Sequence, residues 1–233
     1  MDFLSKIKTF NDQLGADIPG GRSGITQAGC HPVADNEDVA VRIIIIDRSY
    51  SMGYDDYPPS RIQAAIDASI EYVNVLSTQM VKTAVAVVSF GFESKLILPP
   101  TDITALQKIK NGLRSIGIRG GTNIGAGFKR AENLLAKYSP DQQKQIILLT
   151  DGEGICPMEI PENIKLHHNT VIDVVGIGGS PKNVDEKLLK KIATTDPDGT
   201  CHYRFINDTQ ELKQHYRQLA SGIVWKGNPN DNG

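Results

Sequence analysis

Oxygen-bearing side chains follow one strongly aliphatic segment of the sequence. Asp47, Ser49 and Ser51 alternate directly after residues 39–46. In an extended chain, side chains two residues apart point the same way but lie roughly 6–7 Å apart. The ligands of one small cation must converge on it at about 2.1 Å. We therefore expect the chain to curl after Asp47, with Gly53 helping the turn, so that three oxygens surround one point.

Two further segments carry donors of the same kind. Asp151 follows the aliphatic residues 144–150, and Thr122 follows Gly120 and Gly121 at the expected start of a helix. The glycines let the backbone approach closely. The set then holds two carboxylates and three hydroxyls, with no thiolate or imidazole. Such hard oxygen donors favour Mg²⁺ or Mn²⁺, and less strongly Ca²⁺, over zinc or copper.

The elements that must position these side chains alternate regularly between strand and helix. Expected strands cover residues 39–46, 82–90, 95–98, 144–150, 170–177 and 202–206. Expected helices cover residues 60–77, 106–113, 124–138, 159–168, 184–194 and 209–224. This order predicts a doubly wound α/β fold, with a six-stranded, mostly parallel sheet and helices on both faces.

One strand of this sheet is expected to be antiparallel and to lie at an edge. A short hairpin through residues 91–93 would reverse the chain, and Pro99 and Pro100 would end the third strand. In parallel sheets, binding sites form just beyond the carboxyl ends of the strands. Asp47 and Asp151 occupy such positions.

The segments outside this pattern are interpreted separately. Residues 1–38 predict an N-terminal arm, because residues 3–14 place apolar side chains at helical spacing. The arm either packs against the main domain at residues 39–225 or docks another protein. Residues 226–233 resemble a flexible tail. The start of the chain is too polar for a signal peptide, and no apolar run reaches the length of about 18 residues needed to span a membrane, so we expect a cytoplasmic location.

Composition narrows the possible partners. The formal net charge of the 233 residues is −2, so no basic excess points to nucleic acid. Three cysteines are too few and too dispersed for a disulfide framework. Cys30-His31, Cys201-His202 and His167-His168 leave structural zinc as an alternative, but none has the short ligand spacing of a zinc site.

Five of the residues above match a known motif. Asp47-x-Ser49-x-Ser51, Thr122 and Asp151 resemble the metal-ion-dependent adhesion site, or MIDAS, of the von Willebrand A family. Met52-Gly53, Gly120-Gly121-Thr122-Asn123 and Leu149-Thr150-Asp151-Gly152 resemble the flanking sequences of that family. The resemblance covers about residues 39–225.

The resemblance implies a Rossmann-like fold and a complete MIDAS. Ser49, Ser51 and Thr122 would supply hydroxyl oxygens to the metal, and Asp47 and Asp151 would contact it directly or through water. One coordination position would stay open for a Glu or Asp of a partner protein. Two carboxylates neutralise a divalent cation and the hydroxyls add no charge, so the ion can recruit one more carboxylate. By analogy, the chain is similar to intracellular prokaryotic members that work beside ATPases or kinases.

The sequence departs from the usual family pattern beside the site. Arg48 and Tyr50 interrupt the Asp-Ser-Ser motif, and both are expected to face the partner. Asp55 and Asp56, in the acidic loop 54–57, and Glu153 add three acids near the same place. These acids either belong to a solvated loop, or tune metal affinity, or occupy the open coordination position themselves.

Two other functions compete with metal-dependent protein binding. A hydrolase or phosphatase would also use an aspartate after the first strand, but position 49 is Ser rather than a second carboxylate. The sequence has no nucleophile elbow and no P-loop. A scaffold with a vestigial site is the remaining alternative, and the complete set of five ligand positions argues against it. We therefore expect a binding module that is not an enzyme.

Overall fold

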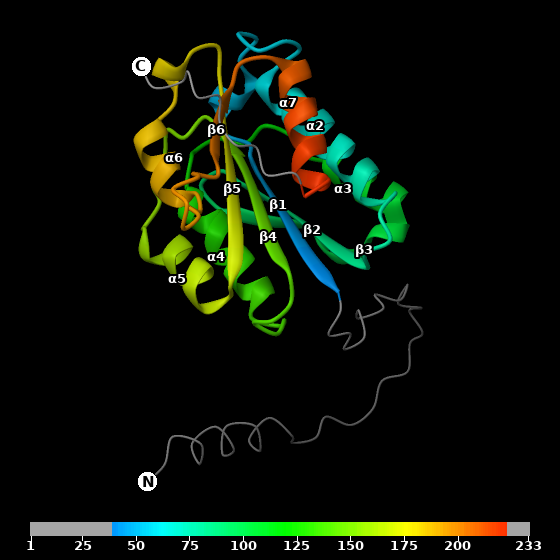
Figure 1. Cartoon of the computed structure of the whole chain (residues 1–233). Coiled ribbons are helices and arrows are strands. Elements are labelled where there is room, and N and C mark those ends of the chain that lie inside the picture. Colours follow the sequence, from blue (N-terminus) through cyan, green and yellow to red (C-terminus); the bar gives the residue numbers. More distant parts are fainter. Residues whose placement is uncertain (1–38, 223–233) are drawn as a thin grey trace, which may run out of the picture. The chain divides into compact units, whose positions relative to one another are not determined.

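The computed structural model describes residues 39–222 as one twisted sheet with helices on both faces (Figure 1). Its strands are β1 (Ala40–Asp47), β2 (Thr83–Phe90), β3 (Ser94–Asp102), β4 (Lys144–Thr150), β5 (Thr170–Ile177) and β6 (Tyr203–Ile206). Their order across the sheet is β3-β2-β1-β4-β5-β6. Neighbouring strands are parallel, except that β2 and β3 are antiparallel. The six-stranded, mostly parallel sheet with one antiparallel edge strand is confirmed.

The helices divide between the two faces of the sheet. They are α2 (Arg61–Leu76), α3 (Leu106–Arg114), α4 (Ile124–Leu135), α5 (Glu159–His167), α6 (Glu186–Ile192) and α7 (Thr209–Ala220). Ile44 and Ile46 of β1 pack with α2, α3 and α7, whereas Ile43 and Ile45 pack with α4, α5 and α6. Figure 1 shows the two helical layers on opposite sides of β1 and β4. Within residues 39–222, no helix is long and apolar enough to cross a membrane.

Helix caps fix where two segments of the site begin. The hydroxyl of Ser60 accepts a hydrogen bond from the Gln63 backbone N–H at 3.3 Å and caps the start of α2. The side chain of Asn123 accepts from the Ala126 N–H at 3.0 Å and starts α4 directly after Thr122. Arg61 and Thr122 therefore stand at the starts of helices on opposite faces of the sheet.

Two predicted boundaries differ most from the structure. β3 continues through Pro99 and Pro100 to Asp102 instead of ending at residue 98. Because β3 pairs only with β2, its other edge lacks a strand, and a proline without an N–H is tolerated there. The last helix ends at Ala220 rather than at residue 224, and Gly222 follows it with a φ of 70°. The predicted helix at residues 3–14 lies outside the described residues.

Candidate metal centre

The chain curls after β1, as the spacing of the oxygens requires. Oδ1 of Asp47 accepts a hydrogen bond from the Ser49 backbone N–H at 2.8 Å, and a 3-10 turn follows at Tyr50–Gly53. The hydroxyl oxygens of Ser49 and Ser51 lie 3.1 Å apart. Gly53 is not needed for this turn, because it has no positive φ. The glycines with positive φ in the site are elsewhere, at Gly121 (80°) and Gly152 (79°).

A hydroxyl missed in the sequence links the ends of β1 and β4. Oγ1 of Thr150 donates to Oδ2 of Asp47 at 2.6 Å and accepts from the Gly152 N–H at 3.0 Å. Both oxygens of Asp47 are therefore held by neighbours, which fixes the orientation of its carboxylate. The sequence did carry a signal, since Thr150 is the polar residue that closes an aliphatic strand and precedes Asp151.

Asp151 presents a buried oxygen without a partner. Its side chain is 1% exposed, and its Oδ1 finds no hydrogen-bond donor in the described part of the chain. Burial, together with the charge of Asp151, raises the pKa of Asp47 to about 6. Two buried carboxylates in one place are costly unless a cation compensates them. The orphaned oxygen and the raised pKa both fit a divalent cation at this position.

The loop that carries Thr122 lies across the ends of β1 and β2. The Arg119 N–H donates to the carbonyl of Arg48 at 2.6 Å, and the Asn123 N–H donates to the carbonyl of Gly91 at 2.8 Å. The carbonyl of Thr122 itself accepts from the residue 155 N–H at 3.3 Å, beyond the end of β4. The fold thus brings together all three segments of the predicted site.

Arg61 is a charged neighbour that the sequence interpretation did not include. Its Nη1 donates to Oδ2 of Asp151 at 3.1 Å, and its Nε donates to Oδ1 of Asp56 at 2.8 Å. The Gly179 N–H also donates to Asp56, at 3.1 Å. The Arg61 guanidinium holds the pKa of Asp56 below its usual range. A signal was available, because an arginine in the first turn of a helix is unfavourable beside the helix dipole unless acids surround it.

The remaining residues near the motif differ in how they are engaged. Asp56 is held by Arg61, while Asp55 and Glu153 are exposed. Tyr50 is 73% exposed, and Arg48 is half-buried.

The alternative of structural zinc finds no support among the described residues. The part of the chain that the structure describes contains no group of three or more His, Cys, Asp and Glu side chains placed to hold a metal. Cys156 and Cys201 are free thiols. Both ring nitrogens of His202 already contact carboxylates, Nδ1 with Asp173 at 2.8 Å and Nε2 with Asp196 at 3.1 Å. Cys30 and its neighbour lie outside the described residues.

Exposed apolar side chains gather near the centre. This apolar rim consists of Tyr50, Tyr54, Phe92, Ile118 and Ile155, which are 73%, 58%, 75%, 39% and 72% exposed. A Cβ at Gly120 would lie 2.1 Å from the ring of Tyr50, and one at Gly121 would lie 2.4 Å from the ring of Phe92. The two glycines therefore let two aromatic rings lie directly on the loop backbone, next to Thr122.

Comparison with known proteins agrees with this arrangement. Residues 42–153 match the model of the von Willebrand factor type A domain. The described residues have the fold of a von Willebrand factor type A domain. The matched segment runs from β1 to the residues just after β4, so it contains all five residues of the motif.

The similar proteins include animal and bacterial chains. Vitrin from Mus musculus is 26% identical over 186 residues, which are 79% of this chain but 27% of vitrin. A structure of proximal thread matrix protein 1 from the mussel byssus is 26% identical, with a TM-score of 0.63 over 78% of this chain and 46% of that one. Another structure of the mussel protein has a zinc-occupied MIDAS motif, at 25% identity and a TM-score of 0.62. BatB from Bacteroides thetaiotaomicron, at 20% identity and a TM-score of 0.60 over 79% of this chain and 98% of that one, shows the fold alone.

Proposed function

We propose that this domain is a metal-dependent protein-binding module. Its metal ligands are the five residues of the motif: Asp47, Ser49, Ser51, Thr122 and Asp151. The observation that carries the proposal is the orphaned Oδ1 of Asp151, buried beside a second carboxylate whose pKa is raised. When bound, a divalent cation supplies a positive charge that can accept a Glu or Asp side chain of a partner protein.

The chain's own residues prepare the site before any partner arrives. Ser49 and Thr150 hold both oxygens of Asp47 in place, so this carboxylate needs no rearrangement to receive a cation. The oxygen donors favour Mg²⁺ or Mn²⁺. The zinc-occupied motif of the mussel protein makes Zn²⁺ a necessary comparison.

The apolar rim favours a protein partner over a small phosphoester. Exposed apolar side chains that lie close together mark interaction surfaces, and tyrosines and phenylalanines are frequent anchors in them. Tyr50 and Phe92 rest on a glycine backbone, so they lose little freedom when a partner covers them. Arg48, Asp55 and Glu153 complete the proposed contact surface. We propose that the domain binds a protein partner and catalyses no reaction. We further propose that it acts in the cytoplasm, where an ATPase or kinase of the same cell is the first partner to test.

Calorimetric titration tests the metal site. Wild-type protein should release or absorb heat with Mg²⁺ or Mn²⁺, and Asp47→Ala and Asp151→Ala should abolish this signal while keeping a cooperative thermal transition. Asp102→Ala is the matched control, because this aspartate only caps a turn after β3. Wild-type protein that binds none of Mg²⁺, Mn²⁺, Ca²⁺ and Zn²⁺ would show that the site is vestigial.

A pull-down from the source cell tests partner binding. Capture should fail in EDTA, return with Mg²⁺, and weaken in Phe92→Ser. Capture that is indifferent to the chelator would show that another surface binds the partner. Metal-dependent hydrolysis of generic phosphoesters that disappears in Asp47→Ala would instead favour the enzyme.

A further inference from the structure

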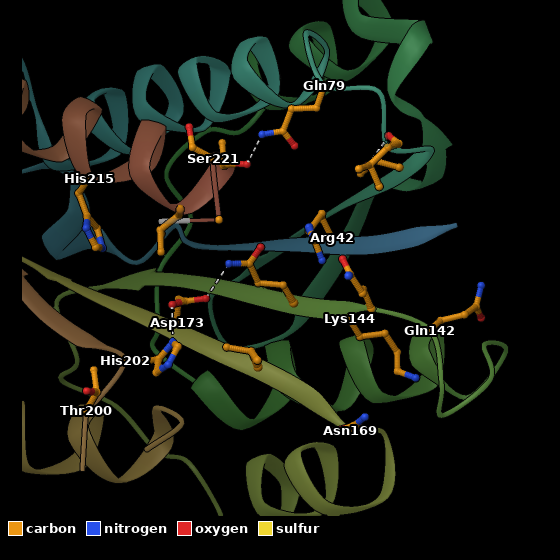
Figure 2. A pocket seen from close by; sticks show the side chains of 18 of the residues that line it. Arg42, Gln79, Gln142, Lys144, Asn169, Asp173, Thr200, His202, His215 and Ser221 are labelled. Atoms are coloured by element: carbon orange, nitrogen blue, oxygen red, sulfur yellow. Dashed lines mark hydrogen bonds and ion pairs between the residues drawn. The ribbon is translucent and has the colours of Figure 1, made fainter. Parts of the chain in front are cut away.

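A cavity lies at the ends of the strands opposite the proposed metal centre. A cavity of about 530 Å³ opens between the amino ends of β1, β4 and β5 and the end of α7 (Figure 2). Arg42 lies on its wall, five residues before Asp47 on β1, so the two sites are separated by about 16 Å along the strand. Pockets of roughly 300–1,000 Å³ are the usual size for small-molecule ligands.

Several polar groups of the cavity wall are joined in a chain of hydrogen bonds. The Tyr72 hydroxyl donates to Gln145 at 2.9 Å, and the Gln145 amide donates to Oδ2 of Asp173 at 2.7 Å. His202 contacts Oδ1 of Asp173 at 2.8 Å, and its Nε2 contacts Asp196 at 3.1 Å. Hydrogen bonds to Asp173, opposed by burial, raise the pKa of His202 to about 9. Both oxygens of Asp173 are therefore engaged, and its charge is balanced by an imidazolium.

Two other cations of the wall also have partners. Arg204 donates to Glu211 at 2.6 Å. The ammonium of Lys144 donates to the carbonyl of Ser139, and burial lowers its pKa although the nearby charge of Asp141 opposes this shift. Neither of these cations needs a ligand to compensate it.

Arg42 differs from these residues. It is half-buried, and its Nε is buried without a hydrogen-bond acceptor among residues 39–222. The ion pairs found between described residues do not include it. Gln145 is its neighbour on β4, but the amide of Gln145 is engaged with Tyr72 and Asp173. An arginine cannot lose its proton, so the cavity wall keeps a positive charge without a counter-ion.

We propose that this cavity binds a small organic carboxylate. Its carboxylate pairs with the guanidinium of Arg42, whose planar donors match that group in geometry. Its apolar body lies against Val81, Val171 and Leu219, which line the same cavity. A phosphate monoester is a dianion and would need a second cation, but His202, Lys144 and Arg204 on the wall already have partners. Figure 2 shows Arg42 between Gln79 and Ser221 on the helical side and Lys144 on the strand side.

Titration followed by protein NMR tests this proposal on the full chain. The probes are benzoate, benzyl alcohol as a neutral counterpart, and phenyl phosphate as a dianion. EDTA is present throughout, because a metal at the MIDAS would also attract carboxylates. Benzoate should shift the signals of residues around Arg42 and bind at least 10-fold more tightly than the other two probes.

Variants of two arginines of the same wall give the matched comparison. Arg42→Gln should weaken benzoate binding at least 10-fold, and Arg42→Lys, which keeps the charge, should weaken it less. Arg204→Gln should leave binding unchanged, because this arginine is paired with Glu211. If Arg42→Gln does not fold, a tighter complex in wild type than in Arg42→Lys, with benzoate still preferred over benzyl alcohol, supports the proposal.

Three results would overturn it. The first is that benzoate shifts no cavity signals in the full chain, as would happen if another segment of the protein covered the cavity. Benzyl alcohol could bind as tightly as benzoate, which would leave no role for the charge. Equal benzoate affinity in wild type, Arg42→Gln and Arg42→Lys would show that the guanidinium does not contact the ligand.

Discussion

Replacing Arg61 by methionine should make the stability of the domain depend on a divalent cation. In the metal-free fold, Nη1 of Arg61 lies 3.1 Å from Oδ2 of Asp151, and the two side chains are 3% and 1% exposed. Methionine keeps much of the length and apolar stem of arginine but removes the charge and all donors. Asp151 would then be a buried carboxylate with neither oxygen hydrogen-bonded.

The expected magnitude follows from the burial of this pair. Removing one partner of a buried ion pair costs about 3–5 kcal/mol, because the other charge stays buried and uncompensated. Asp56, the other partner of Arg61, is 34% exposed and adds little to this cost. In a domain of this size, 1 kcal/mol shifts the melting temperature by about 2–4 °C, so Arg61→Met should melt about 6–20 °C lower than wild type in EDTA.

Thermal unfolding in EDTA and in saturating Mg²⁺ measures this effect. A cation held by Asp151 would compensate its charge, so the difference between variant and wild type should shrink by at least half in Mg²⁺. Arg204→Met is the control, because its ion pair with Glu211 is partly exposed and should contribute at most about 1 kcal/mol in either buffer. An equal loss of stability with and without Mg²⁺, or no loss in EDTA, would show that Arg61 does not compensate the charge of Asp151 in the metal-free fold.

Three further predictions concern other parts of the domain. The pKa of His202 is about 9 in the fold and 6.5 in the unfolded chain. Its ionised form therefore stabilises the fold fully below pH 6.5, and this stabilisation is lost as the pH rises through 9. Denaturation of wild type should show the decline, and denaturation of His202→Gln should not. Gly121→Ala should destabilise the domain by about 1–3 kcal/mol, because φ is 80° and the Phe92 ring lies 2.4 Å from the new Cβ. Gly117→Ala is its control, since nothing lies within 4 Å there. Phe92→Ser should reduce partner capture but leave the calorimetric Mg²⁺ titration unchanged.

The parts of the site that lie at the carboxyl ends of predicted strands were predictable. Aliphatic runs identify β1 and β4, and carboxyl ends of neighbouring parallel strands meet at one edge, so Asp47 and Asp151 had to come close. The curl after Asp47 followed from the spacing of the hydroxyls. Their ligand roles remain predictions that the titration decides.

The groups that hold these carboxylates were not predictable, because side-chain packing between separate elements decides which donor meets which acid. Arg61 and Asp151 are 90 residues apart, and Thr150 and Asp47 are 103 residues apart. No periodicity indicates which arginine will be buried against which acid. The prolines of β3 gave a similar problem, since they are tolerated only because β3 lies at an edge of the sheet.

Arg61 also changes the charge balance expected at the proposed metal centre. The sequence suggested two carboxylates that neutralise a divalent cation. In the structure, Asp151 already shares its charge with Arg61, and Arg61 is shared in turn with Asp56. A cation held by Asp47 and Asp151 would therefore be compensated by less than two full negative charges. Such a cation would attract a third carboxylate more strongly, but the domain would bind the cation itself more weakly. Asp56 limits this loss of affinity for the cation, because it draws part of the charge of Arg61 away from Asp151. Asp56 would thus act on a bound cation through Arg61, without occupying the open coordination position.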